Sequence, residues 1–225
     1  MEFVYVVPRE TLFPTCSPQG FLPFRGPNDL ETTAQGAPNP SQDEFHALVA
    51  AHGFYVERSR AEQTPAWKQI IPYTLVMAEG RVLLVKREKA GGEARLHDKL
   101  SIGIGGHVDS VDAIAAAERK EINPLAAGSR RELEEELDIS GSITIRSIGT
   151  LNDDSNPVGA VHLGLVQVAE VDGTVKVREE DILSGRMVAQ DELGTLLRDG
   201  ANFETWSAIL IERLDGLLPS PITTT

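Results

Sequence analysis

Two apolar runs in the middle of the chain restrict the fold more than any other feature. The first run covers residues 70–77, the turn contains Glu79 and Gly80, and the second run covers residues 81–86. Runs of this length rich in Ile, Val and Leu, separated by a short Gly-containing turn, predict an antiparallel hairpin. Pro72 has no N–H to donate, which places it at the start or at an edge of its strand. We therefore expect a fold built around a β-sheet.

Further strand and helix patterns surround this hairpin, and a long loop is expected over 15–42. Apolar periodicity predicts strands at 3–7, 100–104, 143–151, 158–169, 175–177 and 186–188, and helices at 43–52, 124–137 and 203–217. This order predicts an α/β (α+β) fold in which a mixed β-sheet lies between helices. Residues 1–65 are expected to form an N-terminal extension (strand, long loop, short helix) packed on a core domain that covers 66–225.

The composition narrows the class of protein. The chain has 225 residues, a formal net charge of −13 and one cysteine, Cys16. A single cysteine excludes an internal disulfide and a multi-cysteine zinc site, and no apolar run approaches the roughly 20 residues that span a bilayer. The first residues lack the features of a signal peptide. We expect a cytoplasmic protein that binds neither membranes nor nucleic acid, because nucleic-acid binding requires clustered basic charge.

A run of acidic residues carries the strongest chemical signal. Within the predicted helix at 124–137, Glu132, Glu135 and Glu136 share one side because residues three and four apart meet on a helix. Leu133 and Leu137 face the core. Clustered like charges cost about 0.2–0.5 kcal/mol per pair, and a hard cation would relieve that repulsion. Oxygen ligands of this kind suit Mg²⁺ or Mn²⁺. A solvated acidic helix face is the alternative for such a run taken by itself.

The surroundings of this helix resemble the Nudix (MutT-like) hydrolase motif. That motif runs Gly, five residues, Glu, seven residues, then Arg-Glu-aliphatic-any-Glu-Glu-any-Gly-aliphatic. Its second half matches from Arg131 to Ile139, with Asp138 in place of the second Gly, and its first half begins at Gly106 but reaches Asp112 in place of Glu. The two halves align only with an insertion of 11 residues, roughly 112–122, of which 113–120 is itself helix-prone. The chain as a whole resembles a MutT-type branch described as phosphoesterases.

The resemblance implies a Nudix fold over about 67–217 and a set of site residues. It makes Glu132, Glu135 and Glu136 ligands of Mg²⁺ or Mn²⁺, with the Gly105 carbonyl as a further ligand. Arg131 would orient a glutamate, and Glu135 lies four residues on. An ordinary surface ion pair is the alternative for Arg131.

The general base and the substrate contacts are expected from other segments. Relatives place an extra glutamate near Glu180, and the alternatives for the base are Glu179, Glu135 itself, Asp153 and Asp154. Basic side chains after the hairpin could bind substrate phosphates, or could form a solvated loop: Lys86, Arg87, Lys89 and Arg95.

Two histidines, His107 after the Gly-Gly turn and His162 in a strand, are each expected to be structural rather than ligands when taken alone.

Three functions compete for this sequence. The first is a metal-dependent hydrolase that cleaves a phosphoanhydride in a nucleoside diphosphate derivative or similar small molecule. The second is a Nudix-fold ligand sensor or binding module, disfavoured because all three glutamates are present. The third, an isopentenyl-diphosphate-isomerase-like enzyme, requires a cysteine inside the domain, whereas Cys16 precedes it. Residues 1–65 would serve as a lid, a homodimer contact or a wall of the substrate site.

Overall fold

The structure is a computed structural model, and it describes residues 2–87, 99–178 and 183–218. The described chain divides into two compact units. One contains Met1–Tyr73, Gly105–Arg131 and Ser147–Val166, and the other contains Thr74–Ile104, Glu132–Arg146 and Gln167–Thr225. Several strands and one helix run from one unit into the other along the chain, so each unit is assembled from three separate stretches of sequence.

The first unit is built on the N-terminal strand. Strand β1 (Phe3–Pro8) pairs antiparallel with β3 (Phe54–Glu57) and with the start of β4 (Trp67–Ala78). Val4, Val6 and Val7 are fully buried. Helices α1 (Arg9–Leu12), α2 (Gln42–His52) and α3 (Arg58–Ala61) follow or separate these strands. Strand β2 (Gly20–Pro23) pairs with the end of β8 (Leu137–Asn152). Burial of β1 makes the N-terminal segment part of this unit's core.

The second unit contains the predicted hairpin. Strand β4 turns back into β5 (Arg81–Arg87), with Met77 opposite Val82, and β10 (Leu183–Val188) pairs with the other side of β5. Short strand β6 (Leu100–Ser101) also pairs with β5. Helices α6 (Gln190–Arg198), α7 (Thr205–Ile211) and α8 (Leu214–Leu217) complete this unit. Its apolar core gathers Val76, Leu83, Val85, Leu133, Leu137 and Ala169.

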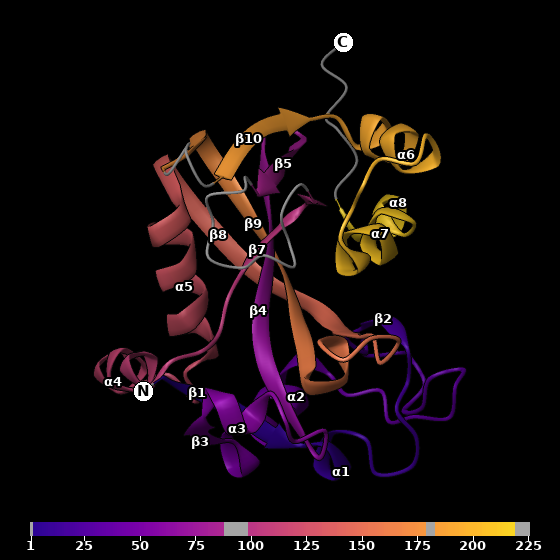
Figure 1. Cartoon of the computed structure of the whole chain (residues 1–225), viewed down its shortest axis with the longest axis vertical. Helices are drawn as coiled ribbons and strands as arrows, with labels where there is room; N and C mark the ends of the chain where they lie inside the picture. The colour runs from indigo at the N-terminus through magenta and orange to yellow at the C-terminus, as the bar shows by residue number, and fades with distance from the viewer. Residues whose placement is uncertain (1, 88–98, 179–182, 219–225) are drawn as a thin grey trace. The chain divides into compact units, whose positions relative to one another are not determined.

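One sheet contains the strands of the described chain, in the order β10-β5-β4-β9-β8-β2, with β1, β3, β6 and β7 paired off this path. Strand β7 (Gly103–Gly105) pairs β4, and β9 is a long strand, His162–Val177. Figure 1 shows helix α5 (Leu125–Glu136) running beside strands β8 and β9, with α4 (Ser110–Glu118) at its start. The predicted α+β fold with a mixed sheet is confirmed.

Most of the predicted elements are present, and the structure differs from the predictions in several places. Strand β2 lies inside the stretch that was expected to be a long loop, 15–42, and β8 begins at Leu137 rather than at 143. Strand β3 and helices α1 and α3 were not predicted. The stretch expected to begin a strand at 158 first forms a 3₁₀ turn, Gly159–Val161, and β9 then continues through the separately predicted strand at 175–177. The expected C-terminal helix is two helices, because Arg213 leaves helical backbone geometry (φ −124°) between α7 and α8. Helix α6 was not predicted. Among the described residues, no helix is long and apolar enough to cross a membrane.

Candidate functional site

Helix α5 forms for local reasons and carries the three glutamates of the motif. The Asn123 side chain accepts a hydrogen bond from the Leu125 N–H (3.2 Å), which satisfies a free donor of the first turn. Leu133 on the helix and Leu137, the first residue of β8, are both buried, and they hold one face of the helix end in the core. On the other faces, Glu132 and Glu136 are half-buried, whereas Glu134 and Glu135 are exposed. The helix therefore carries three glutamates at the spacing that the motif requires.

Arg131 contacts the residue at which the first half of the motif departs from the family pattern. Its Nε and Nη2 donate to the two carboxylate oxygens of Asp112, both at 3.0 Å, and Nη2 also donates to the carbonyl of His107 at 2.7 Å. Asp112 is 2% exposed, and Arg131 binds both of its oxygens, which is the bidentate, charge-assisted arrangement found among the stronger hydrogen bonds in proteins. The pair joins residues 19 positions apart and thereby connects the two halves of the motif across the insertion.

The insertion forms the predicted extra helix, α4, and Asp112 lies in the first turn of this helix. Asp112 accepts a hydrogen bond from the Asp109 N–H at 2.7 Å and completes a capping box. A methyl group on Gly128 of α5 would lie 3.1 Å from Asp112 Oδ2 and from Val108, so the small residue lets α5 approach this carboxylate. One carboxylate thus begins α4 and holds α5. The predicted orientation of Glu135 by Arg131 stays a prediction.

Gly105 ends β7 against the backbone of β4. A Cβ at this position would lie 2.4 Å from the Pro72 carbonyl oxygen, so only glycine permits the approach. This close packing fixes the backbone whose carbonyl was predicted as a metal ligand. Within the described residues, the structure gathers no three carboxylate, imidazole or thiolate side chains into a group that could hold a metal ion. The ligand assignment rests on the helix spacing and on the oxygen chemistry of the donors.

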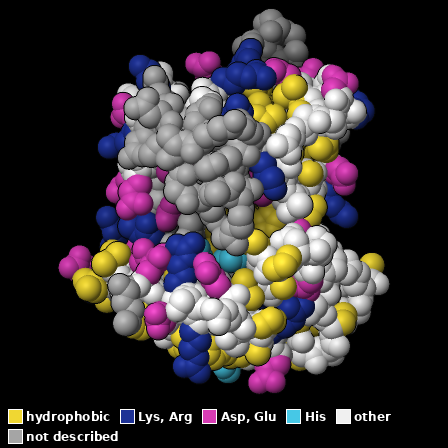
Figure 2. Space-filling model, in the orientation of Figure 1, with side chains coloured by type: hydrophobic (Ala, Val, Ile, Leu, Met, Phe, Trp, Pro, Cys, Tyr) yellow, Lys and Arg dark blue, Asp and Glu magenta, His cyan; other side chains and the backbone are white. Residues whose placement is uncertain are grey.

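Several residues that were predicted to belong to the site lie outside the part of the chain that the structure describes. Lys89, Arg95, Glu179 and Glu180 lie in 88–98 and 179–182, beyond the described residues, as does the side chain of Arg87. Lys86 is half-buried in β5, where it is opposite Ser184 of β10 and Leu100 of β6. On the face drawn in Figure 2, the described Lys and Arg side chains are scattered among Asp and Glu side chains rather than gathered in one patch.

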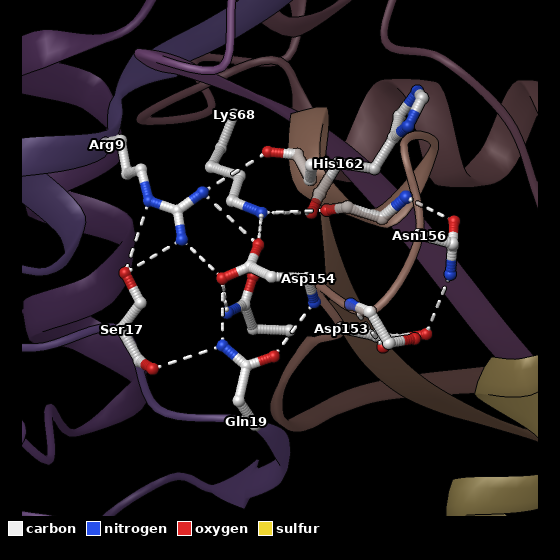
Figure 3. Close-up of polar contacts among 12 residues, drawn as sticks. Arg9, Ser17, Gln19, Lys68, Asp153, Asp154, Asn156 and His162 are labelled. Carbon is white, nitrogen blue, oxygen red and sulfur yellow. Dashed lines mark hydrogen bonds and ion pairs between the residues drawn. The ribbon is translucent and has the colours of Figure 1, made fainter.

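A polar cluster that the sequence did not reveal surrounds Asp154 (Figure 3). The Lys68 ammonium group, fully buried, donates to Asp154 (2.7 Å) and to the carbonyls of Gly159 (2.8 Å) and His162 (3.2 Å). Arg9 forms an ion pair with the same carboxylate, and Gln19 donates to it at 2.8 Å. The cluster ties the N-terminal segment to the turn that precedes β9.

These contacts argue against Asp154 as the general base. Burial alone would raise its pKa, but hydrogen bonds from Arg9, Lys68 and Gln19 outweigh burial and hold the pKa of Asp154 below the ordinary carboxyl value. Asp153 is 7% exposed and accepts hydrogen bonds from the Ser155 N–H and the Asn156 amide. Both carboxylates are engaged in holding the turn.

His107 and His162 meet at their ring tips. The two Nε2 atoms lie 3.3 Å apart, and Nδ1 of His162 lies 2.7 Å from the Val158 carbonyl oxygen. His162 is 8% exposed. Each ring is thus in a polar contact, as expected for a structural imidazole, but the sequence did not predict that the two would face each other.

Known proteins resemble this chain over nearly its whole length. Protein YmaB of Bacillus subtilis (strain 168) is 34% identical over 220 residues, which cover 95% of this chain and 98% of YmaB. The crystal structure of Tm1382, a candidate Nudix hydrolase, matches with a TM-score of 0.75 and 27% identity over 96% of this chain and 100% of Tm1382.

A third similarity concerns the fold alone. DR0079 from Deinococcus radiodurans matches with a TM-score of 0.51 and 17% identity, over 71% of this chain and 90% of DR0079. No protein-family model matches the chain. The similarities to YmaB and Tm1382 show that the chain belongs to the Nudix hydrolase superfamily, in the same family as YmaB.

Proposed function

We propose that this Nudix hydrolase cleaves a phosphoanhydride (diphosphate) bond in a nucleoside diphosphate derivative or a similar small molecule, and that it depends on Mg²⁺ or Mn²⁺. The observation that carries the proposal is the Asp112–Arg131 pair, with both bonds at 3.0 Å. It supports reading Gly106 to Ile139 as one motif in spite of the insertion. The glutamates that follow Arg131 are then those of a hydrolase motif rather than a solvated acidic face.

The chain's own residues have separate roles in this proposal. Glu132, Glu135 and Glu136, with the Gly105 carbonyl, would hold the metal. When bound, the ion would polarise the phosphoryl oxygens and lower the pKa of a water molecule. Glu135 is exposed at the end of α5, which leaves its carboxylate accessible to accept the proton of the attacking water. Arg131 donates to Asp112 and to the His107 carbonyl, and these contacts hold the part of α5 that precedes the glutamates.

Positive charge for the substrate phosphates is proposed to come from Lys86, Arg87 and Arg95, which follow the hairpin along the sequence. Of these, Lys86 is placed by β5, and a lysine in a strand paired on both sides has a well-defined backbone position. Glu180 stays the first candidate for the general base and Glu135 an alternative, and Glu180 lies outside the described residues. The second candidate function, a sensor that binds such a ligand without cleaving it, differs from the first only in the absence of turnover.

A substrate screen with paired variants tests the function. Nucleotide sugars, dinucleoside polyphosphates, ADP-ribose and nucleoside triphosphates would be incubated with Mg²⁺, and phosphate would be measured after a coupled phosphatase. On the substrate found, Glu135→Gln and Glu136→Gln should lower turnover at least about 10²-fold because they remove charge that places the metal. Glu134→Gln, exposed on the same helix, is the matched control and should keep turnover. Near wild-type turnover in Glu135→Gln and Glu136→Gln would contradict the metal assignment.

Metal removal gives a second, independent test. Activity should disappear in EDTA and return with Mg²⁺ or Mn²⁺. Mg²⁺ at about ten times its dissociation constant should also stabilise the fold by about 1.4 kcal/mol, because it binds the native state and not the unfolded chain. The melting temperature is compared in MgCl₂ and in NaCl of equal ionic strength. Equal melting temperatures in both salts would argue against a site on α5, and binding without turnover on any substrate would favour the sensor.

A further inference from the structure

The first part of strand β8 has a free edge. In the sheet, β8 lies between β9 and β2, but β2 pairs only with residues 149–152 of β8. Among the residues that the structure describes, no strand pairs with residues 138–146 on that side. All of these residues except Ile139 and Ile145 are exposed. A free edge of this kind offers unpaired N–H and C=O groups to another strand.

The sequence of this edge lacks the features that usually prevent pairing. Protected edges carry Lys or Pro, or are covered by a helix or a loop. Between Asp138 and Arg146 the segment has no Pro and no charged residue, and its Ile143 side chain is 40% exposed. Ile139 and Ile145 both pack against the apolar core of the second unit, so the alternation of side chains is kept across the segment. The edge therefore has the composition of a strand that pairs.

The order of side chains along this edge fits a second copy of the same segment. When two copies pair antiparallel about Ser142, Asp138 of each copy lies opposite Arg146 of the other. The residues between them are also opposed by residues of a compatible kind: Ile139 by Ile145, Ser140 by Thr144, and Gly141 by Ile143. The segment is therefore complementary to itself in charge and in polarity.

Charge selects a second copy rather than an unrelated acidic or basic strand. An acidic strand would repel Asp138 and a basic strand would repel Arg146, whereas a two-fold axis places each carboxylate opposite a guanidinium. The Arg146 side chain is 44% exposed and lies 3.6 Å from Glu170 of its own chain, a surface pair that leaves the guanidinium accessible. The net charge of −13 acts between any two copies and keeps their association weak.

We propose that residues 138–146 form the contact of a symmetric homodimer, in which two β8 edges pair antiparallel about Ser142 and continue the sheet of one copy into that of the other. A two-fold contact of this kind is closed, because it uses the same edge of both copies. The proposal places the homodimer contact in β8 rather than in residues 1–65. It does not depend on the proposed function, since none of the proposed metal or phosphate ligands takes part.

The first test uses the wild-type full chain. Sedimentation equilibrium between about 1 µM and about 500 µM should show a monomer that converts into a dimer and into nothing larger. Hydrogen exchange measured by mass spectrometry should be slower for residues 138–146 at the higher concentration, and β5, which is paired on both sides, serves as the internal reference. A monomer throughout, an assembly larger than a dimer, or exchange that slows only elsewhere would overturn the proposal.

Charge variants test the register of the pairing. Asp138→Arg and Arg146→Glu each bring like charges together at both ends of the contact, so each should weaken the dimer at least about 10-fold. An equal mixture of the two variants should dimerise again, because in the mixed dimer every one of these side chains faces one of opposite charge. A mixture that associates no better than either variant alone overturns the antiparallel pairing about Ser142.

A change at the centre of the segment tests the edge itself. A charged side chain on an edge strand opposes pairing, so Ile143→Lys should also weaken the dimer at least about 10-fold. Ile114→Lys, at a 64% exposed isoleucine of helix α4, is the matched control and should dimerise as the wild type does. Circular dichroism and the melting temperature check that both variants are folded. Loss of the dimer in Ile114→Lys but not in Ile143→Lys would assign the contact to α4 and overturn the proposal.

Discussion

Lys68 is a fully buried cation whose charge is satisfied by three oxygens on one turn. Its partners are Asp154, the Gly159 carbonyl and the His162 carbonyl, at 2.7, 2.8 and 3.2 Å. Burial lowers the pKa of Lys68, and its contact with Asp154 opposes that change. Arg9 shares the same carboxylate, so removal of Asp154 would leave two cations without their common anion. Such a loss is costly because a buried charge without its partner cannot return to water.

We therefore predict that Asp154→Asn destabilises the protein by about 3 kcal/mol at neutral pH. The pKa of Asp154 is lower in the folded than in the unfolded state, so its contribution is present above the unfolded carboxyl value of about 4 and is lost as the pH falls toward the folded-state value. Urea unfolding of both proteins should show a constant difference between about pH 7 and pH 5 and a smaller one below about pH 4. A difference independent of pH would contradict this assignment.

At the scale of the elements, α4 and α5 meet at one carboxylate. Asp112 begins α4 through the capping box and receives both Arg131 bonds from α5. The helix that carries the glutamates is thus oriented by a residue of the inserted helix. Gly128 keeps the two close, since a larger side chain would lie against Asp112 and Val108.

Replacing this carboxylate should affect both helices at once. We expect Asp112→Asn to lower the free energy of unfolding by about 3 kcal/mol, since an amide of the same shape removes the buried charge that Arg131 binds at two oxygens. Glu118→Gln, at the exposed end of α4, is the control and should change stability by less than about 0.5 kcal/mol. The measurement is urea unfolding followed by far-UV circular dichroism. Equal effects of the two changes would show that the pair does not hold α5.

At the scale of the molecule, the N-terminal segment contributes to a core. Strand β1 lies between β3 and β4, and the apolar cluster of its unit combines Val7, Phe45 and Val49 with Ile70 and Leu165. Apolar burial of this kind is the main favourable term in folding. Arg9 adds an ion pair to a residue 145 positions away.

A chain that begins at residue 66 should therefore not fold as an independent domain. We predict that the fragment 66–225 loses the cooperative urea transition of the full chain and binds the dye ANS, because it exposes the partners of β1 and α2. The full chain, measured alongside, is the reference. A cooperative transition in the fragment, with a circular dichroism spectrum that retains the helix signal, would show that residues 1–65 are a separable extension.

The sequence predicted features that are set by neighbouring residues, and it did not predict contacts between residues that are far apart along the chain. The hairpin of β4 and β5 and helix α5 were predicted because their signals, a turn with Gly80 and the cap at Asn123, are local. Helix α6 was missed because Gly194 interrupts its pattern. The Arg9–Asp154 and His107–His162 contacts join residues that no local pattern connects, so only the folded chain reveals them. For the motif, the residue types could be read from the local sequence, whereas the Asp112–Arg131 pair across the insertion could not.

The insertion also affects how relatives of this protein can be recognised. The chain between Asp112 and Arg131 forms most of α4 and the segment that leads into α5. The ion pair requires only that Asp112 and Arg131 lie close together in the folded chain. The number of residues between Asp112 and Arg131 can therefore vary, because the entropic cost of closing a loop grows slowly with its length. A motif search that requires seven residues between the acidic residue and the arginine misses chains with such an insertion. One that requires an acidic residue six positions after the Gly-Gly turn's second glycine, and lets the following gap vary, would find them.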